Sequence, residues 1–573
     1  MNNQEKIEEY RNNLRHSAAH LLAEAVLKIY PNAKLTIGPP IQDGFYYDFD
    51  IDQTFSPEDL FAIEKEIKRS IKRNTKFLGK ELSKQEALKL YRNNQYKIEI
   101  IKSMPETETI TEYSHSDGGF KDLCRGGHVE KTGEIKAVKL LSAAGAYWRG
   151  NEKNKMLQRI YGTAWESKDL LDDYLEQRKK ALDSDHRKLG NNLNLFFLDP
   201  ISPANPFFLP NGAFIYNALI DYVRSLYKKY EYQEVITPQI FSTDLWKTSG
   251  HYEFYLDNMY MMEIDDREVG FKPMNCPAHA IIYQSTLRSY RDLPMRLADF
   301  GRLHRYERSG VTHGLTRVRS FSQDDAHIFC DQKDAGKEVK NFLDMLTETY
   351  KTFGFKDIRL TLSLRPEKRA GKDEFWDLAE EQLRTVLKNY DNDFQEIEGE
   401  GAFYGPKIDV FVPDAMGREW QLGTAQMDFS LPERFNLDFI NTEGNKERPV
   451  VIHRAMLGSI ERFIGILLEH TSGDLPIWLA PIQVNIIPIS DKHIDYSRKL
   501  SKLLLNEDIR VKIDESNERL GQKIRNSELE KVPVMIIIGD KEVESKTGSV
   551  RIRKQGDIGS LSENEIIKKI LSI

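Results

Sequence analysis

Residues 300–329, in the middle of the chain, constrain the fold more than any other stretch. Five arginines flank a glycine-bearing loop there, and the charge then turns acidic at Asp324 and Asp325 and ends in His327. The arginines are Arg302, Arg305, Arg308, Arg317 and Arg319, and the apolar residues interleaved with the charges are Phe300, Leu303, Val318, Phe321, Ile328 and Phe329. Such interleaving favours half-buried strands that line a cleft over a solvated charged hairpin. Because guanidinium groups bind paired oxygens, the stretch predicts an anion-binding loop beside a site for a cation or an amine.

Length and composition bound the class of protein. A chain of 573 residues can hold several domains, and 30% charged with 40% hydrophobic residues is ordinary for a soluble globular protein. The net charge of −7 argues against binding nucleic acid through bulk positive charge, so any RNA must be held by local patches. Three distant cysteines form no disulfide framework, and no apolar run suits a signal peptide or a membrane span. We therefore expect a cytoplasmic protein without a membrane segment.

The first third of the chain carries two pairs of reactive residues, each with a spacing of four. An amphipathic helix is predicted over Leu14–Tyr30, with two histidines stacked on the face opposite the apolar one. The pairs are His16 with His20, and Cys124 with His128 in a segment that begins at Asp122. These side chains suit either a zinc ion or the positioning of water for attack on an ester. We predict a hydrolytic pocket and leave its metal content open.

The two pairs resemble the editing domain that threonyl- and alanyl-tRNA synthetases share. The resemblance implies an editing site made of His16, His20, Asp122, Cys124 and His128. Gly127 stands where that family commonly has proline before the histidine, which gives the loop more conformational freedom. Threonyl-tRNA synthetases also usually begin with a small ubiquitin-like domain, whereas this sequence begins almost at the editing helix.

Two segments on either side of the central stretch complete a set of three motifs. A helix over Ala213–Lys229 followed by a strand at Tyr232–Ile236 resembles motif 1 of class II aminoacyl-tRNA synthetases, which builds the dimer interface in that class. His304–Glu307 with the loop up to Arg317 resembles motif 2, and Gly458–Gly465 resembles motif 3. The resemblance implies an ATP site, with magnesium accompanying the nucleotide, made of Arg305, Glu307, Arg317, Phe321, Gln421 and Arg462.

The class II resemblance gives these residues roles in forming an adenylate. Arg305 holds the α-phosphate and the amino-acid carboxylate, Glu307 contacts adenine, and Phe321 stacks on the base. By the motif 3 resemblance, Arg462 holds the γ-phosphate. An arginine on so apolar a helix is costly unless an anion answers it, and a partner carboxylate is the alternative to a phosphate. Fixed arginines and magnesium stabilise the negative charge that develops when a carboxylate attacks the α-phosphate.

Three separated residues are candidate metal ligands in the middle of the chain, namely Cys276, His327 and His453. Their spacing alone proves nothing, but the sequence around all three closely resembles threonyl-tRNA synthetases, in which these positions bind zinc. Three protein ligands leave a position open for the amino and hydroxyl groups of threonine, and valine, which lacks the hydroxyl, is rejected. If His327 lies on a strand, Cys330 points to the other face and is a packing residue.

The same resemblance implies further contacts with substrates. We expect threonine to contact Met274, Gln323, Asp325 and Tyr404, and we expect catalytic roles for Arg305, Arg462, His251 and Lys407. His251 matches a family histidine near the terminal ribose of the tRNA that helps to deprotonate it, and an ordinary loop histidine is the alternative. Serine lacks only one methyl group of threonine, worth about 1–3 kcal/mol or roughly 10–200-fold. That ratio is too small for translation, so a second, hydrolytic site is required.

Alternating strands and helices after Pro476 predict a small α/β domain. It resembles the anticodon-binding domain of class IIa synthetases. By that resemblance, anticodon bases are contacted by Asn517, Arg525, Glu542 and Arg551. Polar and basic groups at the ends of strands and helices can read splayed single-stranded bases.

Taken as a whole, the sequence predicts an α+β multidomain protein that resembles threonyl-tRNA synthetases over nearly its full length. We expect an α+β editing domain at 1–166, a helical linker at 167–184, a class II antiparallel-sheet catalytic core at 185–477 and an α/β anticodon-binding domain at 478–573. The expected activity is ATP-dependent ligation of L-threonine to tRNA(Thr) through threonyl-adenylate, by a homodimer with one Zn²⁺ per subunit and Mg²⁺ with ATP, together with hydrolysis of mischarged seryl-tRNA(Thr). A non-catalytic tRNA-binding or regulatory paralogue is the alternative. A free hydrolase would leave Arg305 and Arg462 unexplained.

Overall fold

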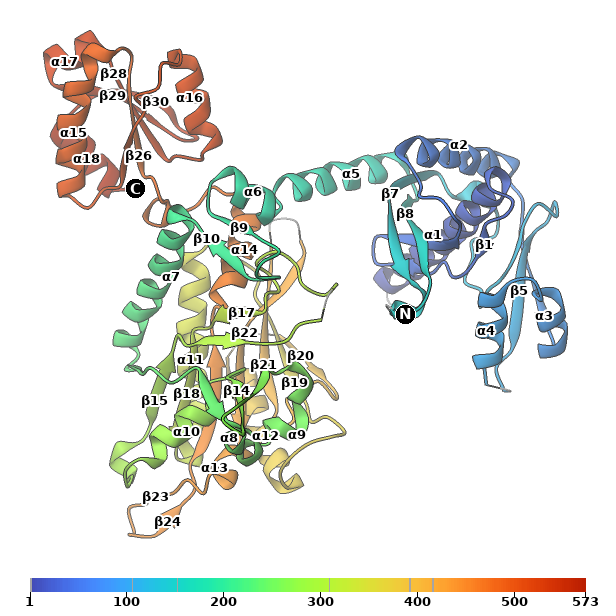
Figure 1. The fold of residues 1–573 in the computed structure, drawn as a ribbon, viewed down its shortest axis with the longest axis horizontal. Helices are drawn as coiled ribbons and strands as arrows, with labels where there is room; N and C mark the ends of the chain where they lie inside the picture. Colours follow the sequence, from blue (N-terminus) through green and yellow to red (C-terminus); the bar gives the residue numbers. More distant parts are fainter. Residues whose placement is uncertain (1–2, 106, 152, 309, 391–392, 415–416) are drawn as a thin grey trace. The chain divides into compact units, whose positions relative to one another are not determined.

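The computed structural model describes residues 3–105, 107–151, 153–308, 310–390, 393–414 and 417–573, so Ser309 of the arginine-rich stretch lies outside them. The chain divides into two compact units, Met1–Lys179 and Lys180–Ile573, and the boundary falls within helix α5 (Lys168–Asp183) (Figure 1). None of the helices in the described ranges is both long enough and apolar enough to cross a membrane.

An antiparallel sheet and two long helices form the main core of the first unit. The strand order is β1-β3-β8-β7, with β2 paired to β3. The elements are α1 (Asn3–Ile29), β1 (Lys34–Leu35), β2 (Pro40–Ile41), β3 (Gly44–Asp50), α2 (Pro57–Arg73), β7 (Ala137–Tyr147) and β8 (Met156–Trp165). Helix α2 begins at a sequence signal, because Ser56 accepts a hydrogen bond from the Asp59 backbone and Pro57 fills the first position. Leu22 of α1 and Phe49 of β3 belong to the same buried cluster.

A second, smaller sheet contributes to the burial of the histidine face of α1. It consists of β4 (Phe77–Leu82), β5 (Ile110–His115) and β6 (Lys121–Leu123), and the neighbouring helices are α3 (Lys84–Leu90) and α4 (Gln95–Ser103). The expected amphipathic character of α1 is therefore wrong, since every residue from Leu14 to Val26 except His16 is buried. The His20 ring is 2% exposed and lies against Phe77 and Phe120, at centroid distances of 6.4 and 5.5 Å.

An eight-stranded sheet organises the second unit, in the order β11-β15-β18-β25-β22-β21-β19-β20. Neighbouring strands are antiparallel except in the outer pairs β11–β15 and β19–β20. The strands are β11 (Gln233–Glu234), β15 (Met295–Asp299), β18 (Asp325–Cys330), β19 (Arg359–Ser363), β20 (Phe394–Ile397), β21 (Lys407–Pro413), β22 (Glu419–Asp428) and β25 (Val450–Ala455). This is the antiparallel core that the sequence predicts, although its motif 1 strand is shorter than expected.

The two faces of this sheet have different neighbours. Ile328 and Ile452 lie in a large apolar core together with residues of helices α7 (Pro210–Lys229), α11 (Ala335–Thr352), α12 (Asp373–Asn389) and α14 (Ile460–Thr471). Because side chains alternate along a strand, His327 and His453 point to the opposite face, where helix α10 (Cys276–Gln284) packs. Cys330 is fully buried in the helix-packed core, as expected of a packing residue.

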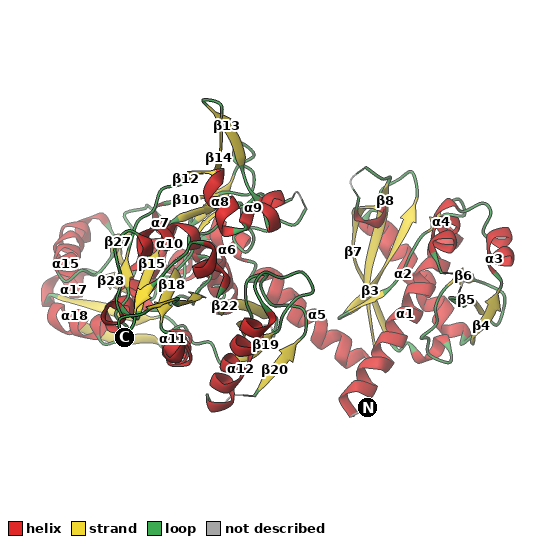
Figure 2. Ribbon diagram, turned by 90° about the horizontal axis from the view of Figure 1, so that it is seen from below, coloured by secondary structure: helices red, strands yellow, loops and turns green. Residues whose placement is uncertain are grey.

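Short elements frame this second face. Strands β16 (Arg302–His304) and β17 (Ser320–Ser322) form a hairpin that carries the arginine-rich loop. Helices α8 (Thr243–Ser249) and α9 (His251–Phe254) precede a small sheet of β12 (Ile240–Ser242), β14 (Arg267–Phe271) and β13 (Met261–Ile264), whose tip projects outward in Figure 2.

The C-terminal part of the second unit is a five-stranded sheet with helices. The strand order is β27-β26-β28-β29-β30, and the first three strands are parallel. The elements are β26 (Val484–Pro488), α15 (Ile494–Asn506), β27 (Val511–Ile513), α16 (Leu520–Leu529), β28 (Val534–Ile538), α17 (Asp540–Ser545), β29 (Thr547–Ile552), β30 (Gly556–Ser562) and α18 (Glu563–Leu571). The predicted α/β alternation is confirmed, while α17 and β30 are not evident in the sequence pattern.

Candidate functional sites

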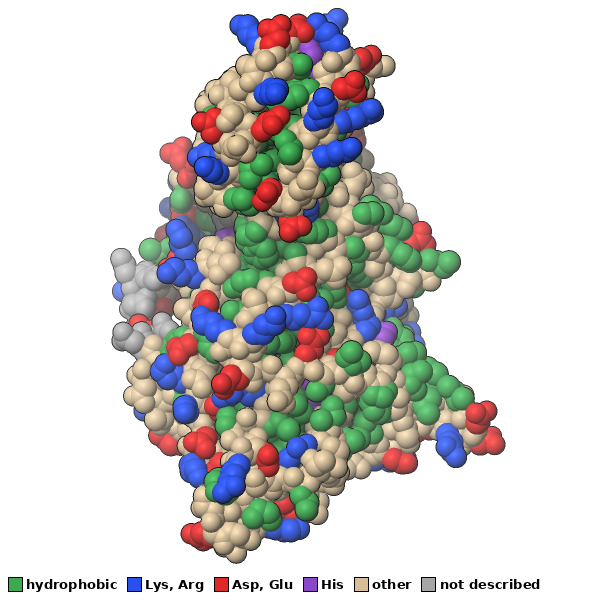
Figure 3. Space-filling view, turned by 90° about the vertical axis from the view of Figure 1, so that its left-hand side faces the viewer, with side chains coloured by type: hydrophobic (Ala, Val, Ile, Leu, Met, Phe, Trp, Pro, Cys, Tyr) green, Lys and Arg blue, Asp and Glu red, His purple; other side chains and the backbone are tan. Residues whose placement is uncertain are grey.

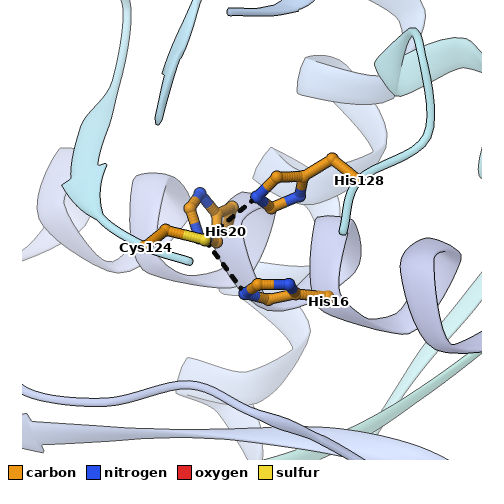
Figure 4. Close-up of side chains that lie close together, drawn as sticks. All are labelled: His16, His20, Cys124 and His128. Carbon is orange, nitrogen blue, oxygen red and sulfur yellow. Dashed lines mark hydrogen bonds between the residues drawn. The ribbon is translucent and has the colours of Figure 1, made fainter. Parts of the chain in front are cut away.

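Four side chains converge in the first unit, as Figure 4 shows. His16 and His20 come from α1, and Cys124 and His128 come from the loop after β6. The Cys124 Sγ lies 3.3 Å from Nε2 of His16 and 3.2 Å from Nε2 of His128. The four candidate ligand atoms all lie within 4.8 Å of one another. The structure thus brings together both sequence pairs.

Burial leaves all four groups uncharged near neutral pH. It lowers the pKa of His16, holds the pKa of His20 well below its usual value and lowers the pKa of His128 to about 2. Burial also raises the pKa of the Cys124 thiol to about 11. Neutral imidazoles can hydrogen-bond to a water and position it, and three imidazoles with one thiol could also close around zinc if the thiol lost its proton.

A cavity of about 500 Å³ opens beside this cluster, and its lining includes His16, His20 and Cys124. Asp122 also lines it, buried and 2.6 Å from Nζ of Lys97, a residue of α4. The hydroxyl of Tyr47 donates to the same carboxylate. The sequence pattern does not single out Lys97 or Tyr47, because each lies in an ordinary element far along the chain from Asp122.

The loop that carries Cys124 and His128 depends on two glycines. Gly126 and Gly127 have φ values of +95° and +80°. Proline fixes φ near −65°, so the proline common in the family could not adopt this conformation at position 127. The loop is held at two points, since the Gly126 nitrogen lies 3.3 Å from Sγ of Cys124 and the Gly127 oxygen 3.2 Å from Nδ1 of His16.

The second unit brings together Cys276, His327 and His453. All three are buried, and their ligand atoms lie within 4.8 Å of one another. His327 and His453 face each other across β18 and β25, with ring centroids 4.6 Å apart, and Cys276 begins α10. Burial holds the pKa of His327 well below its usual value, which keeps the imidazole free to donate its lone pair. One thiol and two neutral imidazoles fit a zinc ion with an open position.

Neighbouring polar groups orient these three residues. Nδ1 of His327 lies 2.8 Å from Nδ1 of His279, and Nε2 of His453 lies 2.9 Å from Oδ2 of Asp428. Such contacts fix ring orientation in metal sites. The sequence pattern does not single out His279, although it follows Cys276 by three positions and therefore shares its face of α10.

His251 lies beside this cluster and is not an exposed loop residue. It is 2% exposed, and its two nitrogens lie 2.8 Å from Oγ of Ser249 and 3.1 Å from Sδ of Met274. Nε2 is also 3.8 Å from Sγ of Cys276. Burial lowers the pKa of His251 to about 3, so its ring is neutral near physiological pH.

The arginine-rich hairpin contacts the segment that leads into Cys276. Nε of Arg305 donates to the carbonyl of Pro273 at 3.2 Å, and its guanidinium lies 5.0 Å from the ring centre of Phe321. Glu307 is paired with Arg317, whose Nε is 3.0 Å from Oε2. The hairpin thereby brings Arg305 next to Phe321 and Arg317 next to Glu307.

Arg462 has no carboxylate ion-pair partner within the part of the chain that the structure describes. Its NH1 donates to the carbonyl of Thr316 at 3.1 Å, and its guanidinium lies 5.5 Å from the ring centre of Trp420. Burial, followed by the nearby charge of Arg317, lowers its pKa. The alternative of a structural ion pair is therefore not supported for these residues, and an anionic ligand would relieve the cost.

The remaining predicted substrate residues lie on strands β18, β21 and β22 or, for Gln323 and Tyr404, in the segments just before β18 and β21. Tyr404 donates to Gln426, and its ring stacks on His453 with centroids 4.9 Å apart. Asp325 accepts a hydrogen bond from Asn275 at 3.1 Å. Gln323 pairs with Ser459 in an isolated bridge, and Lys407 and Gln421 both contact Asp409, at 2.8 and 2.6 Å.

The four predicted anticodon residues are spread over the C-terminal sheet and its helices. Asn517 and Arg525 are exposed, in the segment before α16 and within α16. Glu542 accepts a hydrogen bond from the Gly539 backbone at 3.0 Å and so also caps α17. Arg551 lies on β29, and its buried Nε has no hydrogen-bond partner among the described residues. On the face of the second unit that Figure 3 shows, positive and negative side chains are intermixed.

Three family models match the chain. That of the tRNA synthetase class II core domain (G, H, P, S and T) matches residues 260–471, and that of the anticodon binding domain matches residues 483–573. The model of the threonyl and alanyl tRNA synthetase second additional domain matches residues 110–161.

Relatives and solved structures agree with these matches. The threonine–tRNA ligase of Caldanaerobacter subterraneus subsp. tengcongensis is 50% identical over 97% of this chain and 86% of its own length, and that of Acetivibrio thermocellus is 49% identical over 98% and 88%. A crystal structure of the RNA binding domain of threonyl-tRNA synthetase from Cryptosporidium parvum covers 68% of this chain and 98% of its own, at 46% identity and a TM-score of 0.66. A structure of a threonyl-tRNA synthetase from Aeropyrum pernix covers 68% and 94%, at 33% identity and a TM-score of 0.61. The chain belongs to the threonine–tRNA ligase family of class II aminoacyl-tRNA synthetases.

Proposed function

We propose that this protein activates L-threonine with ATP, transfers it to tRNA(Thr) and hydrolyses seryl-tRNA(Thr) formed in error. The activation step is supported by the short segment that joins the arginine-rich hairpin to the cluster of Cys276, His327 and His453. Arg305 donates to the carbonyl of Pro273, and three residues later Cys276 joins His327 and His453. A phosphate-binding arginine and an amino-acid-binding cluster therefore adjoin through one short segment.

In the activation step, the protein supplies position and charge. Arg305, Arg317 and Arg462 would hold the phosphates of ATP, with Mg²⁺ accompanying the nucleotide, while Phe321 and Glu307 would receive adenine. The guanidinium groups of Arg305 and Arg462 are held before ATP arrives, by the carbonyls of Pro273 and Thr316. Preorganised positive charge stabilises the negative charge that develops on the α-phosphate without a reorganisation cost. Lys407 and Gln421, both in contact with Asp409, would line the same cleft.

Cys276, His327 and His453 would hold one zinc ion per subunit. When bound, zinc supplies a Lewis acid with an open position that takes the amino and hydroxyl groups of threonine and leaves valine without its second contact. Tyr404, Asp325, Gln323 and Met274 would orient the side chain and amino group around that position. Tyr404 already stacks on His453, so the two residues are positioned together.

Serine makes the same contacts as threonine except for one methyl group, so the active site rejects it by only about 10–200-fold. The pocket of the first unit would remove the resulting error. There, the neutral imidazoles of His16, His20 and His128 would hydrogen-bond and position the water that attacks the ester. The buried ion pair of Asp122 and Lys97 lines the same cavity.

Binding of tRNA(Thr) would involve both the C-terminal sheet and the active site. Asn517, Arg525, Glu542 and Arg551 would contact anticodon bases. His251, neutral and next to Cys276, would help to deprotonate the terminal ribose hydroxyl. We also propose a homodimer through the motif 1 segment and a cytoplasmic location, where the charged tRNA is used.

Threonine-dependent exchange of pyrophosphate into ATP tests the activation step. Exchange that depends on threonine and disappears without it is the expected result. A regulatory paralogue would bind tRNA without exchange, and the arginines and zinc-type donors described above favour the catalytic reading. Exchange driven by another amino acid alone would refute the proposal.

A further inference from the structure

A histidine outside the predicted sites, His186, connects the motif 3 helix with the ATP-binding hairpin. It begins helix α6 (His186–Asn192) and is fully buried. Nδ1 lies 2.6 Å from Oε1 of Glu469 in α14, and Nε2 lies 3.0 Å from the backbone nitrogen of Leu315, between β16 and β17. A backbone N–H can only donate, so Nε2 accepts and Nδ1 carries the proton. The ring is therefore a neutral bridge with both nitrogens occupied.

The segment that His186 contacts is a tight turn over residues 313–317. The His313 nitrogen donates to the Arg317 carbonyl at 3.1 Å, and the Thr316 nitrogen donates to the His313 carbonyl at 3.0 Å. Gly314 has a φ of +50°, and a Cβ there would lie 2.0 Å from Nε2 of His186. The ring thus packs directly on the backbone of the turn from which Arg317 extends.

One face of α14 holds the same turn at three positions. Arg462, Gly465 and Glu469 share a face because they are three and seven positions apart on the helix. NH1 of Arg462 donates to the Thr316 carbonyl at 3.1 Å, while Glu469 acts through His186. A Cβ on Gly465 would lie 3.3 Å from side-chain atoms of the turn, so the missing side chain lets the turn sit against the helix.

Holding this turn has an electrostatic cost. After burial, the charge of Arg317 is the next cause that lowers the pKa of Arg462, so the two guanidinium groups repel each other when no anion lies between them. A fixed attachment of the turn offsets this repulsion and keeps both groups ready for a polyanion.

We propose that His186 is a positioning residue for ATP: supported by Glu469, it fixes the turn 313–317 so that Arg317 and Arg462 are presented together to the phosphates. It touches no substrate itself. The proposal rests on the proposed function, because that function assigns these two arginines to ATP.

The test measures threonine-dependent pyrophosphate exchange while ATP and threonine are varied separately. In His186→Ala, the KM for ATP should rise about tenfold, as expected for the loss of a buried hydrogen bond, and the KM for threonine should change by less than about twofold. Glu469→Ala should behave like His186→Ala, whereas Glu469→Gln keeps an oxygen for the Nδ1 proton and should retain most of the affinity for ATP. His470→Ala, next along α14 but away from the turn, is the matched control and should leave both KM values unchanged.

Gly465→Ala covers the case in which His186→Ala does not fold. Alanine favours the helix, so the melting temperature should hold or rise, while the added methyl group displaces the turn and raises the KM for ATP. An unchanged KM for ATP in folded His186→Ala or in Gly465→Ala would overturn the proposal, and so would equal increases for ATP and threonine. If the wild type shows no threonine-dependent exchange, the proposed function fails instead, and calorimetric ATP binding by the same variants then decides the role of His186.

Discussion

At the scale of single residues, two arginines of the second unit, Arg454 and the half-buried Arg462, differ in how their charge is compensated. Arg454 is buried, with 1% of its surface exposed. It donates a hydrogen bond to the Asp324 carbonyl at 2.7 Å, and its guanidinium lies 4.1 Å from the ring centre of Tyr232. Arg462 has a carbonyl and an indole as neighbours, and no carboxylate pairs with it among the described residues. The first arginine is part of the folded core, and the second is available to a ligand.

Replacing Arg462 with methionine should separate activity from stability. The free energy of unfolding should change by no more than about 1 kcal/mol, because an uncompensated charge is removed together with one hydrogen bond. Pyrophosphate exchange should fall by about 10²-fold or more, since a phosphate-binding group is lost. Denaturant unfolding and exchange kinetics on one preparation measure both. A large loss of stability would show that Arg462 is structural.

Arg454→Met is the matched comparison and should destabilise the fold by about 3–5 kcal/mol, because it leaves the Asp324 carboxylate buried without its partner. Burial already raises the pKa of Asp324 to about 7, although Arg454 and the backbone N–H groups of Met456 and Leu457 lower it. A folded pKa above the unfolded value costs stability as the pH rises through that interval. Since the variant raises this pKa further, its loss of melting temperature should be larger at about pH 8 than at about pH 5. An equal loss at both would contradict this account of Asp324.

Cys276→Ser should remove zinc and threonine activation together. Serine is a poor zinc ligand, and exchange should fall by about 10²-fold or more. Cys330→Ser provides the control, because Cys330 is also fully buried but faces the helix-packed core. It should lose about 1–3 kcal/mol of stability for its buried hydroxyl and keep its zinc. Full exchange activity in Cys276→Ser would exclude the zinc role.

At the scale of elements, the glycine loop of the first unit decides how Cys124 and His128 meet the histidines of α1. Its two positive φ values place Cys124 and His128 over α1, and the Gly127 oxygen contacts His16 directly. A loop with a proline at this position must reach the same cluster along another backbone path. Gly127 is therefore a structural requirement of this particular loop.

Gly127→Ala should slow the hydrolysis of seryl-tRNA by about fivefold or more, because a positive φ costs an alanine about 1–2 kcal/mol and the loop shifts to relieve it. The new Cβ would also lie 2.9 Å from Oδ1 of Asn13. Gly118→Ala is the control, since Gly118 has a φ of +73° with nothing within 4 Å of its Cβ. It should lose similar stability and keep its hydrolytic rate. Equal hydrolysis by both variants would show that the loop does not set the site.

At the scale of the whole molecule, the two units carry separable chemistry. Changing both His16 and His20 to alanine should slow hydrolysis of seryl-tRNA(Thr) by about 10²-fold or more, so that this product accumulates. Threonine-dependent exchange should stay at the wild-type rate, because the cluster of Cys276, His327 and His453 in the second unit shares no residue with this pocket. Unchanged hydrolysis in the double variant would remove the pocket from the proposed function.

The sequence could predict those features that residues close together in the chain determine. These include the order of the motifs, the alternation of strands and helices at the C-terminus and the helix that ends at Lys229, all of which the structure contains. The sequence could not predict the burial of His20 or the contacts of His186. His186 lies 129 positions from Leu315 and 283 from Glu469, and no periodicity joins residues so far apart. Lys97 is missed for the same reason, because its partner Asp122 comes from another element.

The central claim is that Cys276, His327 and His453 make this protein select threonine for reaction with ATP. Zinc content and amino-acid-dependent pyrophosphate exchange, measured on the same sample, test it most directly. The account predicts about one zinc per chain and exchange with threonine and weakly with serine, but not with valine. Full threonine-dependent exchange by a metal-free sample, or exchange driven only by a different amino acid, would contradict it.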